Sequence, residues 1–413
     1  MRSVRSKPRR RQSAPTTAAP SPGPLDDGPV TLAMIQALIP LGLRAVEDAL
    51  QQEVRTLAGA RYARADGHAG IVRWGTQPGS IFLADQKLPI TVPRVRDGVA
   101  HREVPLQTYP QLQTPRTHDA GRFRRVLGGL SCREYQAAAE AVPEAFGLAR
   151  SSVSRRFIRA SAHEWRRLQE RRLDDAEWLV LVLDGQSFAG AQLVVALGVT
   201  TTGEKRILGL VQPASENQRV LAAFLRELGE RGFPLDQPLL VGLDGAKGLR
   251  AAVREVCGDV PVQRCQWQKR EHVVSDLAKR DQPGWRRKLQ AAYAHPTSVE
   301  AKRALDRLHR ELRLQNASAA ASLEEGLDET LTLHRLGVFP GLGVSFKTTN
   351  LIESVMARLE AKTRRVTHWR TRDQTLRWCA SALCATERQF RRVKGHRQLP
   401  LLKQALHTHS AAA

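Results

Sequence analysis

The sequence predicts a mixed α/β fold, in which a helix-covered sheet is interrupted by a long helical segment. Three observations lead to this class. Residues 178–183 form an uninterrupted Leu/Val-rich run, which is typical of a strand buried on both faces. Further strand and helix patterns alternate after it up to a second apolar run at 238–243. Residues 269–334 then show only helical spacing with charged faces.

The composition narrows the class of protein. The chain has 413 residues, which suggests two or three domains, and 42 % hydrophobic residues, which is enough for cores. No apolar run reaches the roughly 18 residues needed to cross a bilayer, so no membrane partner is expected. The excess of Lys and Arg over Asp and Glu, 64 − 41 = +23, predicts attraction to polyanions, nucleic acid above all. Five scattered cysteines without a CxxC pair, and a basic N-terminus without an apolar signal segment, predict a cytoplasmic protein.

The first part of the chain changes character twice. Residues 1–28 are basic and then rich in Pro, Ala and Ser, which predicts a disordered basic arm. Residues 29–120 are predicted to form an N-terminal α/β region. Its apolar spacing predicts a helix up to residue 57 that is interrupted or bent near Pro40, followed by short strands between 71 and 97 that Gly and Pro turns separate.

Residues 121–173 are helical and basic, and their layout predicts a helix-turn-helix-like DNA-binding region. A short helix over 132–142 is followed by a Gly-containing turn and a Ser/Arg-rich helix capped by Ser151 or Ser152. In this layout the first turns of the second helix enter the major groove. The residues expected to contact DNA are Ser151, Ser152, Ser154, Arg155 and Arg156. The alternative is an ordinary helical pair whose arginines are solvated.

The rest of the chain is predicted to form a split core. Residues 174–268 supply its first part, residues 269–343 a helical insertion, and residues 344–413 its C-terminal part, with a strong helix over 349–363 and a basic tail. Within the first part the expected strands are 178–183, 193–199, 205–211, 238–243 and 260–264, and the expected helices are 217–231 and 249–256. Three antiparallel strands followed by a helix and a parallel strand predict a mixed sheet.

Three carboxylates stand out in this core. Asp184 and Asp244 each end a buried Leu/Val strand and are each followed by Gly. Aspartate is costly at such a position unless a cation meets its charge, and Mg²⁺ prefers oxygen ligands. Glu353, in the first turn of the helix at 349–363, is the candidate third carboxylate. The alternatives are that Asp-Gly only marks turns and that Glu353 forms a capping box with Asn350.

An ordered series of motifs covers the chain from about residue 175 to 405. It includes Val182-Leu-Asp-Gly, Leu243-Asp-Gly-Ala-Lys-Gly-Leu, Val262-Gln-Arg-Cys-Gln-Trp, Thr348-Thr-Asn-Leu-Ile-Glu-Ser and Thr367-His-Trp-Arg. In this order the motifs resemble the Mutator-type bacterial transposases of the IS256 family. One such motif alone is not specific for this family, whereas the whole ordered series is.

The resemblance implies a ribonuclease H-like catalytic core with an Asp-Asp-Glu triad. By motif match the triad is Asp184, Asp244 and Glu353, with gaps of 244 − 184 = 60 and 353 − 244 = 109 residues. The long second gap is what a helical insertion requires. The implied metal is Mg²⁺, two ions held by these three acids, with Mn²⁺ as a substitute.

The resemblance also implies partners and a reaction. The partners are DNA, both the terminal inverted repeats and the target, and further copies of the chain in a homodimer or larger assembly at the nucleoid. The reaction is DNA cleavage followed by strand transfer. No nucleotide cofactor is expected, because the sequence contains no GxxxxGK[ST] motif.

One motif departs from the family pattern. The family commonly carries Cys-x-x-His after the last core strand, whereas here Cys265 is followed by Gln268. Glutamine is a poor metal ligand and cannot transfer a proton. His272, one helical turn further, is a candidate substitute, and Cys265 is a candidate buried core thiol. The departure leaves open a catalytically inactive DNA-binding remnant; a ribonuclease H-type nuclease without strand transfer is the other alternative.

Basic residues near the triad are further candidates for DNA contact. Lys247 closely follows Asp244, and the stretch 364–378 interleaves arginines with Trp369 and Trp378. The residues expected to meet phosphates are Lys247, Arg364, Arg365, Arg370 and Arg372. The alternatives are a solvated Lys247, and tryptophans in the core with arginines at its rim.

Overall fold

The computed structural model of the chain describes residues 27–61, 70–83, 86–113, 120–132, 149–188, 190–213 and 217–412. These residues belong to two compact units, one within 1–117 together with 140–147, the other within 118–139 and 148–413. The predicted basic arm lies outside the described residues except for Asp27 and Gly28, which begin a helix. The first helix of the predicted helix-turn-helix also lies outside them, apart from Cys132.

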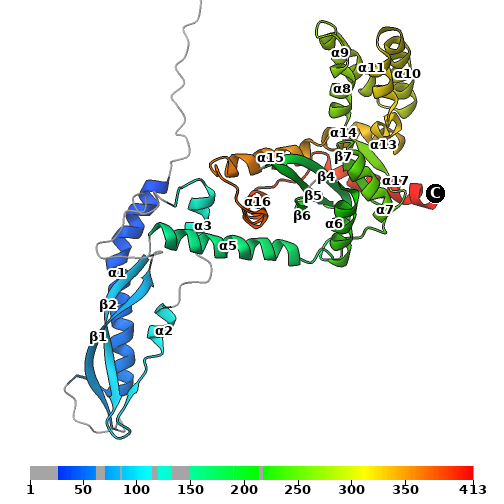
Figure 1. The fold of residues 1–413 in the computed structure, drawn as a ribbon. Coiled ribbons are helices and arrows are strands. Elements are labelled where there is room, and N and C mark those ends of the chain that lie inside the picture. Colours follow the sequence, from blue (N-terminus) through cyan, green and yellow to red (C-terminus); the bar gives the residue numbers. More distant parts are fainter. Residues whose placement is uncertain are drawn as a thin grey trace, which may run out of the picture. The chain divides into compact units, whose positions relative to one another are not determined.

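The first unit packs one long helix against an antiparallel hairpin (Figure 1). Helix α1 (Asp27–Ala58) is continuous through position 40, so of the two predicted outcomes near Pro40 the interruption is wrong. A proline removes a single N–H donor from the ladder. The helix beyond it is held because Leu50 and Val54, each 1 % exposed, are packed in the apolar cluster shared with the hairpin.

The hairpin has two long strands instead of the several short ones that were predicted. Gly75, with φ +85°, lies in a register shift between Arg73 and Thr76, so it forms a bulge and does not end the strand. The elements are β1 (Ile71–Leu83), β2 (Gln86–Asp97), the short β3 (Arg102–Val104) and α2 (Thr108–Gln113).

The second unit is built on a five-stranded mixed sheet, as the strand pattern predicted, and the strands lie in the order β6-β5-β4-β7-β8. Strand β4 is antiparallel to β5 and parallel to β7. The strands are β4 (Trp178–Phe188), β5 (Ala191–Thr200), β6 (Lys205–Val211), β7 (Leu240–Leu243) and β8 (Val262–Arg264). The prediction that β4 ends before Asp184 is wrong, because residues 184–188 pair with 191–195 of β5 and extend the strand.

Helices cover both faces of this sheet (Figure 1). Leu181 and Leu183 join one apolar cluster with α6 (Gln218–Glu230) and α7 (Lys247–Cys257). Val180 and Val182 join another with α5 (Arg150–Glu170), α15 (Asn350–Thr363) and α16 (Arg372–Glu387). Because side chains alternate along a strand, Asp184 belongs to the second face, beneath α15.

Helix α5 belongs to the second unit rather than standing apart from it. It begins at Arg150 after an extended Ala149, so Ser151 and Ser152 lie in its first turn, and neither is the predicted N-cap. Its Phe157 ring lies 4.4 Å from the ring of Trp378 on α16, between centroids. Helix α3 (Ala120–Leu127) adds to the same cluster.

Between β8 and α15 the chain is helical, as the spacing predicted, and a distinct apolar cluster forms there. The helices are α8 (Gln266–Ser275), α9 (Gln282–Tyr293), α10 (Ser298–Gln315), α11 (Ala317–Glu324), α12 (Leu327–Thr330), α13 (Thr332–Arg335) and α14 (Phe339–Phe346). The chain ends in η1 (His396–Gln398) and α17 (Leu399–Ala412). None of the helices in the described ranges is long and apolar enough to cross a membrane.

Candidate active site

The sheet and α15 bring the three predicted acids together. Asp184 lies in β4, and Asp244 directly follows the neighbouring parallel strand β7. Val182 pairs with Gly242, so the same register continued by two residues sets Asp184 beside Asp244. Glu353 lies in the first turn of α15, which packs on β4.

The charge state of Asp184 reflects this convergence. Its side chain is buried, and the residue is 6 % exposed. Burial, and then the nearby carboxylates of Asp244 and Glu353, together raise its pKa to about 7. The charges of Asp244 and Glu353 act on this pKa, so the three acids lie close enough to form one acid cluster. Such a site stabilises a cation.

Hydrogen bonds fix the other two acids. The Ala246 N–H donates to Asp244 Oδ1 at 2.9 Å, closing a tight turn in which Gly245 has φ +106°. Thr349 Oγ1 donates to Glu353 Oε1 at 2.7 Å. The capping-box alternative for Glu353 is therefore wrong, because its carboxylate bonds the Thr349 hydroxyl one turn earlier.

Cys265 contacts the neighbours of both Asp244 and Glu353. The Cys265 N–H donates to the Leu243 carbonyl at 2.9 Å, immediately before Asp244. Cys265 Sγ lies 3.4 Å from Thr349 Oγ1, the same hydroxyl that holds Glu353. The sequence did not single out Thr349; its position four residues before Glu353, at the start of a helix, was the available signal.

The residues of the altered Cys-x-x-His motif differ in their surroundings. Cys265 is 1 % exposed, as expected of a buried core thiol. Gln268 is half-buried, and its Oε1 is buried with no hydrogen-bond partner in the part of the chain that the structure describes. His272 is exposed one turn further along α8, so it does not share the buried position of Gln268.

The donor set suits a hard divalent cation. All three acids offer carboxylate oxygens, the ligands that Mg²⁺ prefers, and the raised pKa of Asp184 shows that a counter-charge is missing among the protein groups. Across the described ranges, no three acidic, His or Cys side chains already stand in metal-coordinating geometry. Side-chain rotation would have to complete such a set.

The predicted DNA-contacting residues at the start of α5 lie at the surface or close to it. Ser151 and Arg155 are exposed, whereas Ser152, Ser154 and Arg156 are half-buried. Their contact with DNA remains a prediction.

The second group of predicted DNA-contacting residues, Lys247 and four arginines between 364 and 372, lies near the same end of β4 as Asp184. Lys247 is the first residue of α7 and is exposed, as are Arg364, Arg365, Arg370 and Arg372. The ring of Trp369, within this basic stretch, lies 5.3 Å from that of Phe188 between centroids. Phe188 follows Asp184 by four residues on β4, which places the stretch along the strand that carries the first acid.

Comparison with known proteins shows that the chain is similar to transposases of insertion sequences. The model of the family "Transposase, Mutator family" matches residues 36–392. The transposase for insertion sequence element IST2 of Acidithiobacillus ferrooxidans is 30 % identical over 174 residues, covering 42 % of this chain and 57 % of that relative. The transposase for IS6120 of Mycolicibacterium smegmatis is 27 % identical over 246 residues, covering 58 % of this chain and 74 % of that relative.

A longer match is more distant. The transposase for IS256 in transposon Tn4001 of Staphylococcus aureus is 25 % identical over 295 residues, covering 67 % of this chain and 70 % of that relative. The IST2 relative is thus matched over little more than half its length, whereas the family model spans most of the present chain. The chain that brings Asp184, Asp244 and Glu353 together is a member of the Mutator family of transposases.

Proposed function

We propose that this protein is the DNA transposase of an insertion sequence. It binds the element's terminal inverted repeats and catalyses DNA cleavage and strand transfer through Asp184, Asp244 and Glu353. The observation that carries the proposal is the raised pKa of Asp184, which the other two acids help to produce. The five-stranded mixed sheet is compatible with the ribonuclease H-like core that the resemblance implies.

The three acids would hold two Mg²⁺ ions, which, when bound, supply an activated water and a counter-charge for the leaving oxygen. The chain's own contribution is to place the ligands. The Ala246 N–H holds the Asp244 carboxylate, and the Thr349 hydroxyl holds the Glu353 carboxylate.

Two phosphodiester exchanges follow in this scheme. In the first, a water oxygen bonds to phosphorus at the element's end, the bond from phosphorus to the 3′ oxygen breaks, and that oxygen takes up a proton as a free 3′-OH. In the second, this hydroxyl loses its proton, its oxygen bonds to a target-strand phosphorus, the bond from that phosphorus to the target's 3′ oxygen breaks, and the leaving oxygen takes up a proton as a new 3′-OH. The exposed Lys247 and Arg364 would hold the DNA backbone near the acids.

A catalytically inactive DNA-binding remnant is the second candidate, favoured by Gln268. Its buried, unbonded Oε1 is a local defect at the position where the family commonly has His. A ribonuclease H-type nuclease would differ in its product, because it would cut without joining the 3′ end to a target strand.

Cleavage of labelled DNA tests these candidates together. A duplex carrying the element's terminal repeat, incubated with Mg²⁺ or EDTA, should be nicked at the repeat boundary only with Mg²⁺. Asp184→Asn should reduce this rate at least about a hundredfold, since several kcal/mol of charge stabilisation is lost. The exposed Asp236→Asn is the matched control and should cleave normally.

The alternatives predict different results. Specific binding without cleavage by the natural chain, with cleavage appearing in Gln268→His, would establish the inactive remnant. Cleavage with no joined product on an added target duplex would establish a nuclease.

A further inference from the structure

A basic cavity of about 490 Å³ lies apart from the acid cluster. It is formed by the C-terminal half of α5, the start of β6, and the chain from the last turn of α16 to residue 392. Seven lining side chains are cationic, whereas only Glu204 and Glu387 are acidic. None of the seven belongs to the predicted DNA-contacting residues.

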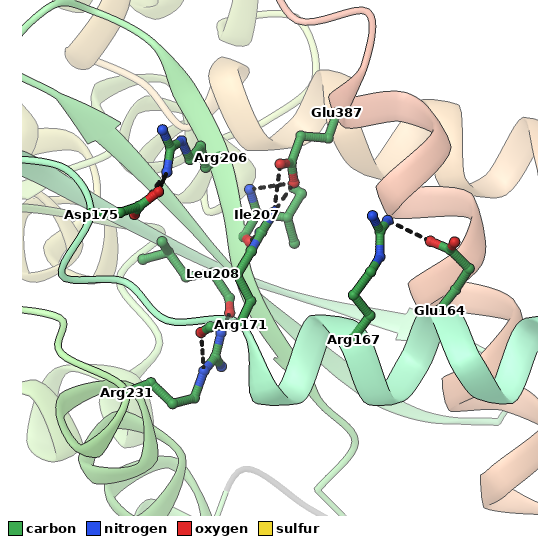
Figure 2. Close-up of polar contacts among 9 residues, drawn as sticks. All are labelled: Glu164, Arg167, Arg171, Asp175, Arg206, Ile207, Leu208, Arg231 and Glu387. Carbon is green, nitrogen blue, oxygen red and sulfur yellow. Dashed lines mark hydrogen bonds and ion pairs between the residues drawn. The ribbon is translucent and has the colours of Figure 1, made fainter.

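Four of these cations have acidic partners. Figure 2 shows three of the pairs along α5 and β6. The four are Arg167–Glu164 at 2.6 Å, Arg171–Glu387 at 2.7 Å, Arg206–Asp175 at 2.7 Å and Arg392–Glu204 at 3.8 Å.

The wall of the cavity is held rigidly by a polar network (Figure 2). Arg171 donates to the Ile207 carbonyl and to Glu387, and Glu387 also accepts from the Ile207 N–H at 3.0 Å. Behind it the buried Arg231 donates to the Arg171 carbonyl at 3.0 Å and to the Leu208 carbonyl at 2.8 Å. Side chains fixed in this way need little reordering when a ligand binds.

The other three cations have no acid to neutralise them. Among the described residues, Lys205, Arg388 and Arg391 form no ion pair. Lys205 Nζ lies 5.1 Å from the ring centroid of Phe390, a contact between cation and aromatic face. Burial, and then the charge of Arg358, lowers the pKa of Lys205. The cavity therefore has three uncompensated positive charges.

The strand register locates the cavity relative to the acids. Lys205 pairs with Val199 on β5, which pairs with Val180 on β4, so these positions share the face of Asp184. Four residues along β4 and two strand spacings separate Lys205 from Asp184, or roughly 16 Å. A DNA duplex rises about 3.4 Å along its axis per nucleotide, so the separation, measured along a duplex axis, corresponds to about five nucleotides.

We propose that this cavity binds the phosphodiester backbone of DNA, several nucleotides from the bond cleaved at the acid cluster. The inference rests on the proposed function, because it takes DNA as the substrate. The cavity, at about 490 Å³, is larger than one phosphate needs. For comparison, a single water molecule takes up about 30 Å³ in the liquid. Arg388, Arg391 and Arg392 are exposed, so a long strand can reach the cavity without entering the core.

Salt-dependent DNA binding by the full chain tests the proposal. The variant is Arg388→Ala with Arg391→Ala, which removes two exposed, unpaired cations and leaves the network around Arg171 intact. The matched control is Arg310→Ala with Arg313→Ala on α10, which has the same spacing and charge change at exposed positions without ion pairs in the described chain. The probe is a fluorescein-labelled duplex of mixed sequence, followed by anisotropy over a range of salt concentrations.

Each lost phosphate contact should reduce the slope of log K against log salt concentration by about 0.9. The cavity variant should therefore lose about 1.8 in slope relative to the control pair, with an unchanged unfolding temperature. Equal slopes in the two variants would overturn the cavity site while leaving the proposed function standing. Failure of the natural chain to bind any duplex would instead count against the proposed function.

A second arm separates DNA from a small anion. Inorganic phosphate is titrated into the natural chain and the cavity variant by calorimetry. Phosphate binding that the variant loses, with no change in its DNA slope, would make the cavity a small-anion site and overturn the proposal. A DNA slope that changes as expected, with weak or absent phosphate binding, supports it.

Discussion

At the residue scale, the chain buries a lysine beside its altered motif. Lys269 directly follows Gln268 and is 1 % exposed. Its Nζ lies 3.7 Å from Glu325 Oε2 and has no hydrogen-bond partner in the described ranges. Burial, and then the charge of Arg264, lower the pKa of Lys269 to about 8. A charge held in this way costs stability.

This cost predicts a pH dependence of stability. An unfolded lysine titrates near 10.4, so from about pH 8 to 10.4 the unfolded chain binds the extra proton and the free energy of unfolding rises with pH. Lys269→Met should remove this contribution and raise the free energy of unfolding at pH 7 by about 1–3 kcal/mol. Urea unfolding at pH 7 to 10 measures both effects. The exposed Lys279→Met should change neither, and a variant as pH-dependent as the natural chain would contradict the interpretation.

Single residues were predictable from the sequence where strand ends marked them. Asp184 and Asp244 stand out because a charge follows each apolar strand. The role of Glu353 was ambiguous, because a glutamate in a first turn has a local explanation as well. Thr349 offered only its spacing four residues before Glu353 as a signal, and Lys269 could not be predicted, because its acidic partner Glu325 lies far away in the sequence.

At the element scale, one glutamate joins three elements. Glu387, near the end of α16, accepts from Arg171 just after α5 and from the backbone of Ile207 on β6. Its side chain is 19 % exposed and that of Arg171 is 28 % exposed, so solvent screens the pair only partly. The pair fixes the edge strand of the sheet to the helices that cover it.

Removal of the Glu387 carboxylate should therefore lower the free energy of unfolding substantially. Glu387→Ala leaves an unpaired arginine and an unbonded N–H, and we expect a loss of about 2–3 kcal/mol, below the value for a fully buried pair because of the partial exposure. Asp174→Ala, which breaks the exposed pair with Arg172, should cost less than about 1 kcal/mol. Chemical unfolding of both variants measures the difference; equal losses would show that Glu387 has no special structural role.

The strands of the two sheets show which structural features the local sequence can predict and which it cannot. The mixed character of the sheet followed from the sequence, because an antiparallel meander and a parallel strand were both visible in the pattern, whereas the order of the strands was not predicted. The extent of β1 did not, because whether Gly75 ends a strand or forms a bulge depends on the partner strand. The same holds for β4, which continues past Asp184 because β5 is there to pair with it.

At the scale of the whole molecule, the apolar clusters follow the division into two units. One cluster lies wholly in the first unit, and the other three lie wholly in the second. Helix α3 belongs to the second unit, where Phe123, Val126 and Leu127 are buried. This boundary between residues 117 and 118 differs slightly from residue 120, where the sequence placed the end of the N-terminal region, because composition does not show which core a short helix joins.

Two fragments test the boundary. A fragment of residues 118–413 keeps three clusters complete and should unfold cooperatively at nearly the temperature of the full chain. A fragment of residues 149–413 loses three buried apolar side chains of α3, which should lower that temperature by at least roughly 10 °C. Circular dichroism on heating measures both. Equal temperatures for the two fragments would show that α3 contributes nothing to the second unit.

The position of Glu353 also has a consequence during translation. The ribosome completes Asp244 109 residues before Glu353, so at about 5–20 residues per second the third acid emerges several seconds or more after the second. Until α15 is made, one face of the sheet lacks the helix that carries this acid. Nascent chains, and products of messages truncated before codon 353, therefore contain the first two acids without the third and should be unable to cut DNA.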